Sequence, residues 1–199
     1  MLPSLALGNP GAQEETMARE RVAAPKKLIA YVTRTDNTKV VAEIIHRAVG
    51  GTMVEIETAT PYPENYDAIV AQVVREDEAG YAPPLKDNVK DIQNYDTVFI
   101  GFPTWNMRAP PPIRSFLGKH DLRGKTVVPF NTNGGYGVGS GFQMVTALCP
   151  RSNILHGFST RGGLEKEGIY LAIKGQMREQ VHAEVVAWLR SIGMTAVAG

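Results

Sequence analysis

The chain has 199 residues, of which 43% are hydrophobic and 21% charged, and its formal net charge is +1. This length allows one domain with a tail, and the charge gives no reason to expect nucleic acid or an acidic membrane surface as a partner. No apolar run reaches the length of a membrane span. The single cysteine, Cys149, excludes an internal disulfide, and the four histidines have no metal-ligand spacing, so no metal site is predicted.

Residues 9–25 are polar and lack periodicity, apart from a short helix expected near residues 14–22. Leu2–Gly8 is similar to the end of a signal peptide, with small residues where a cleavage site would lie. Two interpretations stay open: a shortened secretory signal, which places the protein in the periplasm, or a leader without meaning, which leaves the cytoplasm as the default. We expect residues 1–25 to form an arm, with a homodimer contact as one use for it, and 194–199 to form a tail.

The next stretch predicts a strand, a turn and a helix. Leu28–Val32 is an apolar run of strand length, and apolar residues recur at helical spacing over 40–49 before Gly50 ends the helix. A strand-to-helix turn gathers free backbone N–H groups at the positive end of a helix dipole, which favours an anion, most often phosphate. The turn also offers three threonine hydroxyls and an asparagine amide as donors. The alternative is that Asn37 or Thr35 only caps the helix.

Strand and helix patterns alternate along the rest of the chain. We expect strands over 53–57, 97–102, 126–132 and 153–158, and helices over 65–79, 110–117, 142–148 and 177–192. The charged helix end Arg75-Glu76-Asp77-Glu78 is interpreted as a solvated face rather than a metal site. This alternation predicts an α/β fold with a parallel sheet, in which ligands bind at the carboxyl ends of the strands.

Three unusual loops fall at that edge, over 33–38, 103–108 and 131–141. The first suits a phosphate, the second carries Trp105, and the third is rich in glycine, which permits positive φ or a close approach to a ligand. Together they predict an elongated ligand with a phosphate at one end and a flat ring at the other.

At these motifs the chain resembles the flavodoxins. The resemblance covers roughly residues 26–192 and is carried by Thr33-Arg34-Thr35-Asp36-Asn37-Thr38-Lys39 and by the segments 61–67, 95–105 and 124–130. It implies a flavodoxin-like domain over 26–193, built as a three-layer α/β sandwich. Its five-stranded parallel sheet would have the order 2-1-3-4-5, with helices on both faces. It also implies FMN as the cofactor.

The cofactor-binding residues expected from the loops and the resemblance fall into two groups. The phosphate group is Thr33, Arg34, Thr35, Asp36 through its backbone N–H, Asn37 and Thr38. The ring would lie between the second and third loops, with contacts from Pro103, Thr104, Trp105, Asn106, Met107, Asn131, Thr132, Asn133, Gly134, Gly135, Tyr136 and Gly139. No catalytic side chain is required, because the flavin carries the redox chemistry.

Two departures from the family pattern stand out. Asp36 replaces the usual glycine of the first loop, and aspartate tolerates a left-handed backbone better than most residues. Asn106-Met107-Arg108 replaces an aromatic and a glycine after Trp105, so the positive-φ glycine of that loop is missing. Arg108 near the ring would stabilise the reduced anion and raise the flavin potential.

The resemblance leaves three functions open. The first is an FMN-binding electron-transfer protein that serves a redox partner protein or a small-molecule electron acceptor. The second is an FMN-dependent oxidoreductase, a quinone or flavin reductase that uses NAD(P)H. The third is a flavodoxin-like scaffold that has lost FMN because of Asp36.

Overall fold

The computed structural model describes residues 25–194, and within that range no helix is long and apolar enough to cross a membrane. Apart from Pro25 and Met194, the predicted arm over 1–25, the signal-like stretch Leu2–Gly8 and the predicted tail over 194–199 lie outside the described residues.

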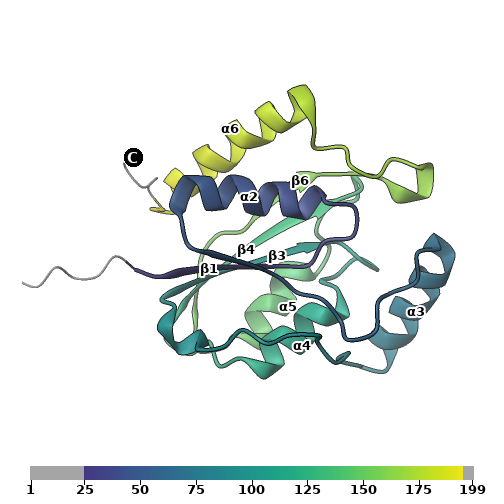
Figure 1. The fold of residues 1–199 in the computed structure, drawn as a ribbon, viewed down its shortest axis with the longest axis horizontal. Helices are drawn as coiled ribbons and strands as arrows, with labels where there is room; N and C mark the ends of the chain where they lie inside the picture. Colours follow the sequence, from purple (N-terminus) through teal and green to yellow (C-terminus); the bar gives the residue numbers. More distant parts are fainter. Residues whose placement is uncertain (1–24, 195–199) are drawn as a thin grey trace, which may run out of the picture.

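A parallel sheet forms the centre of the molecule (Figure 1). Its first four strands along the chain are β1 (Lys27–Tyr31), β2 (Thr52–Glu55), β3 (Thr97–Pro103) and β4 (Thr126–Asn133). The strand order is β2-β1-β3-β4-β5, and every pairing is parallel. The predicted order 2-1-3-4-5 is confirmed. The central β3 is buried along almost its whole length, as its continuous apolar sequence indicates.

The fifth position of the sheet differs from the prediction of one strand over 153–158. Two short strands, β5 (Asn153–Ile154) and β6 (Phe158–Arg161), both pair with β4. Val127 pairs with Ile154, but Phe130 pairs with Phe158, so one extra residue lies between the two pairings. Such an insertion is a β-bulge. Beyond the bulge, β6 runs beside β4 as far as the pairing of Asn133 with Arg161, so residues 162–165 follow at the carboxyl edge of the sheet.

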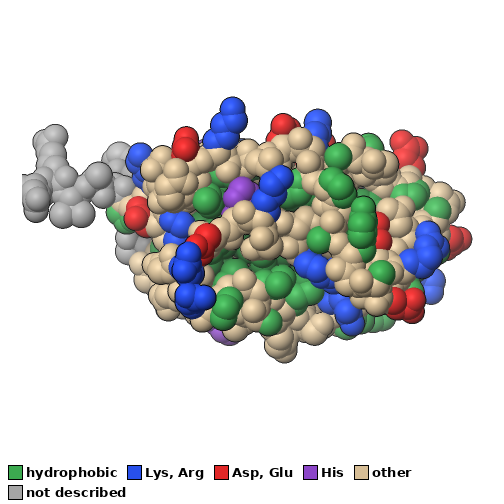
Figure 2. All heavy atoms as spheres, turned by 90° about the horizontal axis from the view of Figure 1, so that it is seen from below, with side chains coloured by type: hydrophobic (Ala, Val, Ile, Leu, Met, Phe, Trp, Pro, Cys, Tyr) green, Lys and Arg blue, Asp and Glu red, His purple; other side chains and the backbone are tan. Residues whose placement is uncertain are grey.

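Helices cover both faces of the sheet, which confirms the three-layer sandwich. α2 (Asn37–Val49) and α6 (Gly175–Ser191) lie on one face, and α4 (Pro111–Lys119) and α5 (Gly141–Leu148) lie on the other (Figure 1). Each pair of helices closes its own core cluster against the sheet. Seen from the side of α4 and α5, basic and acidic side chains are interspersed rather than gathered by sign (Figure 2).

The remaining long helix, α3 (Tyr66–Glu78), stands apart from these two pairs, at the carboxyl edge of the sheet (Figure 1). It begins at Asn65, whose side-chain oxygen accepts a hydrogen bond from the Ala68 N–H at 2.9 Å. Ile69 and Val73 are its most buried apolar side chains, yet neither belongs to the two core clusters. The apolar face of α3 is therefore not buried in either of the two main core clusters.

Candidate functional site

A cavity of about 330 Å³ opens at the carboxyl edge of the sheet, where the three predicted loops meet. Most of the predicted site residues line it. These are Arg34, Thr35, Asn37, Pro103, Thr104, Trp105, Asn106, Met107, Thr132, Asn133, Gly134 and Tyr136. The convergence follows from the topology, because the carboxyl ends of parallel strands meet at one edge.

The other predicted residues do not line the cavity: Thr33, Asp36, Thr38, Asn131, Gly135 and Gly139. Two of them, Thr38 and Asn131, form hydrogen bonds with residues that line the cavity. The hydroxyls of Thr38 and Thr132 lie 2.8 Å apart and are buried. The fully buried Asn131 amide donates to the Phe102 carbonyl and to the Thr104 hydroxyl, each at 3.0 Å, and so joins the ends of β3 and β4.

Sequence reasoning missed a second group of lining residues. The face of α3 contributes Tyr66, Ile69, Val70 and Val73, and the segment after β6 contributes Gly162, Gly163, Leu164 and Glu165. Gly137, which also lines the cavity, lies within the predicted third loop. The helical spacing of the α3 residues was visible in the sequence, but it predicted only a buried face. What that face is buried against depends on where the helix lies.

The first loop takes its shape from a left-handed residue directly before α2. Asp36 has φ 59° and ψ 0°, and its carbonyl accepts the first helical hydrogen bond from the Val40 N–H at 2.9 Å. Aspartate is among the residues most often found in this conformation. The Asp36 side chain is exposed and lies outside the cavity lining, so the loop keeps its form without turning a carboxylate into the cavity.

The hydroxyl of Thr33 is the unsatisfied group of this loop. Its Oγ1 atom is buried and has no hydrogen-bond partner among residues 25–194. Buried polar atoms in native proteins almost always have a partner, and an orphan indicates a ligand or water that completes the site. Thr33 directly follows Val32 at the end of the first strand, beside the start of α2. An anion bound at that helix start is the natural partner for this hydroxyl.

The Asn37 side chain has no donor or acceptor left for a ligand. Its amide donates to the Thr35 hydroxyl at 2.9 Å and to the Tyr170 carbonyl at 2.7 Å. Its oxygen accepts from the backbone N–H groups of Ala172 and Ile173, each at 3.0 Å. An asparagine amide offers two donors and two acceptors, and all are used here. The side chain ties residues 170–173 to the first loop, which leaves its backbone N–H for the predicted phosphate.

Arg34 also holds chain segments together. Its guanidinium binds the Glu165 carboxylate at 2.7–3.0 Å and donates to the carbonyls of Pro63 at 2.8 Å and Glu64 at 2.6 Å. Both partners of the ion pair are largely buried. Because Arg34 and Glu165 are the charged side chains of the cavity lining, the wall described here carries no net charge.

The second loop ends in a tight turn beside the cavity. Trp105 and Arg108 exchange two backbone hydrogen bonds, at 2.9 and 3.1 Å, around Asn106 and Met107. Both central residues have positive φ, 46° and 56°, as in a type I′ turn. In this conformation the Cβ of any non-glycine residue crowds the carbonyl, but the short polar side chain of asparagine can offset this by local hydrogen bonding, which methionine cannot do. The missing glycine is thus replaced by a methionine that keeps the left-handed backbone.

The third loop is folded around Asn133. The Asn133 side-chain oxygen accepts hydrogen bonds from the N–H groups of Gly135 at 2.9 Å and Gly137 at 3.1 Å. Gly137 in turn accepts a hydrogen bond from the Thr104 hydroxyl at 2.9 Å. Gly139 has φ 56°, and a Cβ added there would collide with the Met107 carbonyl. The second and third loops therefore touch through backbone that only a glycine permits.

Trp105 is flanked by an aromatic residue that the sequence analysis did not assign to the site. The Tyr62 ring packs edge-on against Trp105, with ring centroids 5.1 Å apart and planes at 76°. The Tyr62 hydroxyl donates to the Glu76 carboxylate at 2.5 Å. Burial and this hydrogen bond together raise the pKa of Tyr62 far above its usual value.

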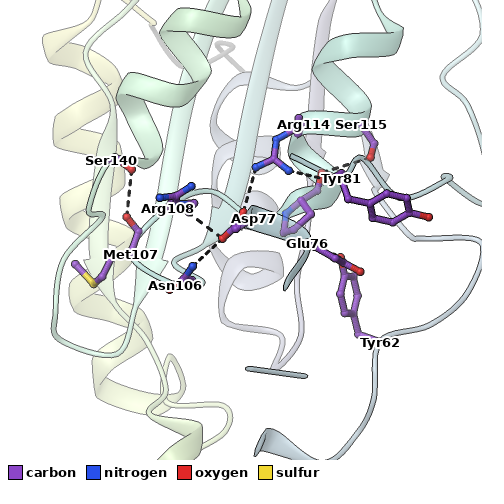
Figure 3. A network of polar contacts seen from close by, with 11 residues as sticks. Tyr62, Glu76, Asp77, Tyr81, Asn106, Met107, Arg108, Arg114, Ser115 and Ser140 are labelled. Atoms are coloured by element: carbon purple, nitrogen blue, oxygen red, sulfur yellow. Dashed lines mark hydrogen bonds and ion pairs between the residues drawn. The ribbon is translucent and has the colours of Figure 1, made fainter. Parts of the chain in front are cut away.

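The sequence had predicted that the charged end of α3 is a solvated face. The structure corrects this for Glu76 and Asp77, whose side chains are buried, while Arg75 and Glu78 are exposed. The Asp77 side chain is only 3% exposed and lies among three donors (Figure 3). Its carboxylate accepts from the Arg114 guanidinium at 3.1 Å and from the Asn106 amide at 3.0 Å, and Arg108 Nε lies 3.8 Å away. Arg108 thus turns toward Asp77 and does not line the cavity, which removes the geometric basis for its predicted action on a ring.

Comparison with known proteins shows which proteins share this sequence pattern and fold. The flavodoxin family profile matches residues 26–173. A candidate flavoprotein from Bacteroides eggerthii is 29% identical, with a TM-score of 0.68 over 85% of this chain and 99% of that one. One from Bacteroides uniformis is 28% identical, with a TM-score of 0.67 over 81% and 98%.

A flavoprotein from Lactobacillus acidophilus, solved in complex with FMN, shares the fold. It is 23% identical, with a TM-score of 0.61 over 69% of this chain and 93% of that one. No curated protein matches the chain.

Proposed function

The chain belongs to the flavodoxin family, whose profile covers residues 26–173, and we propose that it binds FMN in the cavity at the carboxyl edge of its sheet and transfers electrons. When bound, FMN supplies one- and two-electron chemistry through its isoalloxazine ring. The protein's residues bind and orient the cofactor and control access to the ring. FMN binding by the Lactobacillus acidophilus relative supports this proposal.

The unpartnered Thr33 hydroxyl carries the proposal. It is buried just outside the cavity lining, directly before Arg34 and Thr35, which line the cavity, and the first N–H groups of α2 follow a few residues later. The first N–H groups of a helix have no partner within the helix and suit an anion. The FMN phosphate would receive hydrogen bonds from this hydroxyl, from Thr35 and from the backbone N–H groups of residues 36–38. Each hydrogen bond to a charged group contributes about 1.5–3 kcal/mol. Neutral donors suffice here, since Arg34 is committed to Glu165.

The rest of the cavity suits the other parts of the cofactor. Thr132 and Asn133 lie between the phosphate loop and the ring side, where the ribityl chain would run. Trp105, Tyr136 and the aliphatic face of α3 would enclose the isoalloxazine. Apolar walls of this kind exclude water from the ring and strengthen the remaining electrostatic interactions. No lining side chain is assigned as a general acid or base.

The test is FMN titration of the full chain, followed by absorbance, with the isosteric variant Thr33→Val. We expect the wild-type protein to bind FMN and Thr33→Val to bind about tenfold more weakly, since only a hydroxyl is removed. Thr52→Val is the matched control, because Thr52 is exposed on β2. A wild-type protein that does not bind FMN would contradict the proposed function. Equal FMN affinities of Thr33→Val and Thr52→Val would contradict the role of the Thr33 hydroxyl.

A second candidate function is reduction of quinones or flavins with NAD(P)H. Exposed hydrophobic side chains favour it, because Tyr66, Val70, Met107 and Tyr136 all line the cavity and are 37–72% exposed. An accessible apolar mouth suits a small planar electron acceptor. Oxidation of NAD(P)H by the FMN-loaded protein with a water-soluble quinone tests this function. Turnover no faster than that of free FMN would leave electron transfer between proteins as the proposed role.

A further inference from the structure

Two buried carboxylates at the end of α3 contact the ring side of the cavity from outside it. Glu76 and Asp77 are adjacent in the sequence, but their side chains bind different segments (Figure 3). Buried carboxylates are unfavourable unless they are paired and hydrogen-bonded, so their presence at a helix end requires an explanation. Neither side chain lines the cavity, so neither is explained by contact with a ligand there.

Glu76 acts on Trp105 through Tyr62. One carboxylate oxygen accepts the Tyr62 hydroxyl at 2.5 Å, and the other accepts the Gln72 amide at 2.8 Å. This fixes the Tyr62 ring, whose edge packs against the Trp105 indole at a centroid distance of 5.1 Å. An edge-to-face aromatic contact is directional, so it restricts the orientation of Trp105 as well as its position.

Asp77 acts on the turn that follows Trp105. Its Oδ2 atom accepts the Asn106 amide at 3.0 Å and lies 3.8 Å from Arg108 Nε, while Oδ1 accepts Arg114 at 3.1 Å. Arg114 also donates to the Tyr81 carbonyl at 2.7 Å, which anchors the chain just after α3. One carboxylate thereby joins α3, α4 and the turn between Trp105 and Arg108.

The turn over 105–108 depends on contacts from other segments, because its sequence does not favour its backbone conformation. Met107 has φ 56°, a conformation that costs a non-glycine residue about 1–2 kcal/mol. Type I′ turns favour glycine at this second central position. The Ser140 N–H donates to the Met107 carbonyl at 2.9 Å from one side, and Asp77 holds Asn106 from the other.

We propose that Asp77 and Glu76 are positioning residues, which hold Trp105 and the left-handed Asn106–Met107 turn in the form that makes the ring-side wall of the cavity. Asp77 acts on the turn and Glu76 on the indole. The wall is therefore set by the end of a helix that begins about forty residues earlier in the chain and lies outside both core clusters. The proposal about the wall stands on geometry; only its effect on FMN rests on the proposed function.

The main test is Asp77→Asn, with Glu78→Gln as a matched control on the neighbouring exposed carboxylate. The chain has two tryptophans, so the indole N–H signals in ¹H–¹⁵N NMR spectra of the flavin-free protein report Trp105 and Trp188 separately. We expect Asp77→Asn to shift the Trp105 signal, to leave the Trp188 signal in place and to weaken FMN binding about tenfold. Glu78→Gln should change none of these.

A rescue experiment separates positioning from general stability. In the Met107→Gly background the turn has its preferred Asn-Gly sequence and needs less support from Asp77. We expect Asp77→Asn to weaken FMN binding less than threefold in that background. If the tenfold loss persists beside glycine, Asp77 does not act by holding the strained turn.

Two further variants keep the proposal testable if Asp77→Asn does not fold. Asn106→Gly removes the contact with Asp77 but keeps a residue that accepts positive φ, and Tyr62→Phe removes the contact with Glu76. Each should shift the Trp105 signal. An unchanged Trp105 signal in both variants would overturn the positioning role. A wild-type protein that binds no FMN would overturn the proposed function instead, and the NMR result would still decide the role of α3.

Discussion

The cavity has two ends that are built in different ways. At the phosphate end, the loop over 33–38 is held by its own side chains, with Asn37 and Arg34 tying it to the segment over 162–173. At the ring end, the turn over 105–108 makes few contacts of its own and is held by Asp77 of α3 and by Ser140. Both ends place non-glycine residues in the left-handed region, Asp36 in one and both Asn106 and Met107 in the other.

The difference lies in how well each sequence suits its backbone. Aspartate accepts the left-handed conformation, and Thr33 Oγ1 is the buried side-chain polar atom of the first loop that lacks a partner among residues 25–194. Methionine is poorly suited to it, so the ring-side turn depends on groups distant in the chain. Both ends are tied to segments distant in the chain, so the contrast lies in backbone strain. The first loop has a residue suited to its conformation at Asp36, whereas the turn needs outside contacts to offset the strain at Met107. Four measurements test this contrast.

The largest expected effect is at the phosphate end. Asn37→Ala leaves the N–H groups of Ala172 and Ile173 and the carbonyl of Tyr170 without their partner. We expect the free energy of unfolding to fall by about 3 kcal/mol, because buried polar groups lose their hydrogen bonds. Urea denaturation measures it. The exposed Asn88→Ala is the control and should stay within about 0.5 kcal/mol of wild type; a similar loss in both variants would contradict the anchoring role of Asn37.

The next effect is at the ring end, where Gly139 of the third loop contacts the turn over 105–108. Gly139→Ala places a Cβ against the Met107 carbonyl at a residue with φ 56°. We expect a loss of about 2–3 kcal/mol of unfolding free energy and weaker FMN binding. Gly137→Ala has a similar backbone, with φ 83°, but open space around the added atom. It should cost only about 1 kcal/mol for its backbone conformation. Equal losses would show that the contact with Met107 does not matter.

A smaller effect compares Asp36 and Met107, which both have a left-handed backbone. Met107→Gly should raise the free energy of unfolding by about 1 kcal/mol, since glycine adopts positive φ without strain. Asp36→Gly should raise it by less than about 0.5 kcal/mol, because aspartate already tolerates this conformation. Removal of the Asp36 charge should instead tighten FMN binding by about threefold. Urea denaturation and FMN titration of both variants measure these changes; a larger stability gain at Asp36 would reverse the comparison.

The smallest effect is a matter of pH. Burial and the hydrogen bond to Glu76 raise the pKa of Tyr62, so its phenol stays neutral in the folded protein where an ordinary tyrosine, near pH 10, ionises. The unfolded state then binds fewer protons, and the contribution of Tyr62 to stability declines as the pH rises above 10. Titration of tyrosinate absorbance, wild type against Tyr62→Phe, should show no difference below pH 11 in the folded protein. A difference at pH 10 would mean that Glu76 does not hold the hydroxyl.

Much of the fold was predictable because its signals are local. The buried run of β3, the helical spacing after the first loop and the alternation of elements predicted an α/β fold with a parallel sheet. The resemblance to the flavodoxins implied the sheet order that the structure has. The bulge between β5 and β6 was not predictable from the apolar pattern over 153–158, because it is set by which residues of β4 the two short strands pair with. Arg108 was assigned to a ring for its place in the loop, but its partner Asp77 lies on another element.

The sequence by itself indicated the proposed phosphate end of the site, since hydrogen-bonding groups, a helix start and a tolerant left-handed residue all lie within six consecutive positions. Only the tertiary structure decided the ring end. There the sequence shows a methionine where the turn prefers glycine, and two acidic residues that resemble any solvated helix end. Their meaning depends on α3 lying beside the turn, because a buried carboxylate and a strained backbone stabilise each other only when folding brings them into contact.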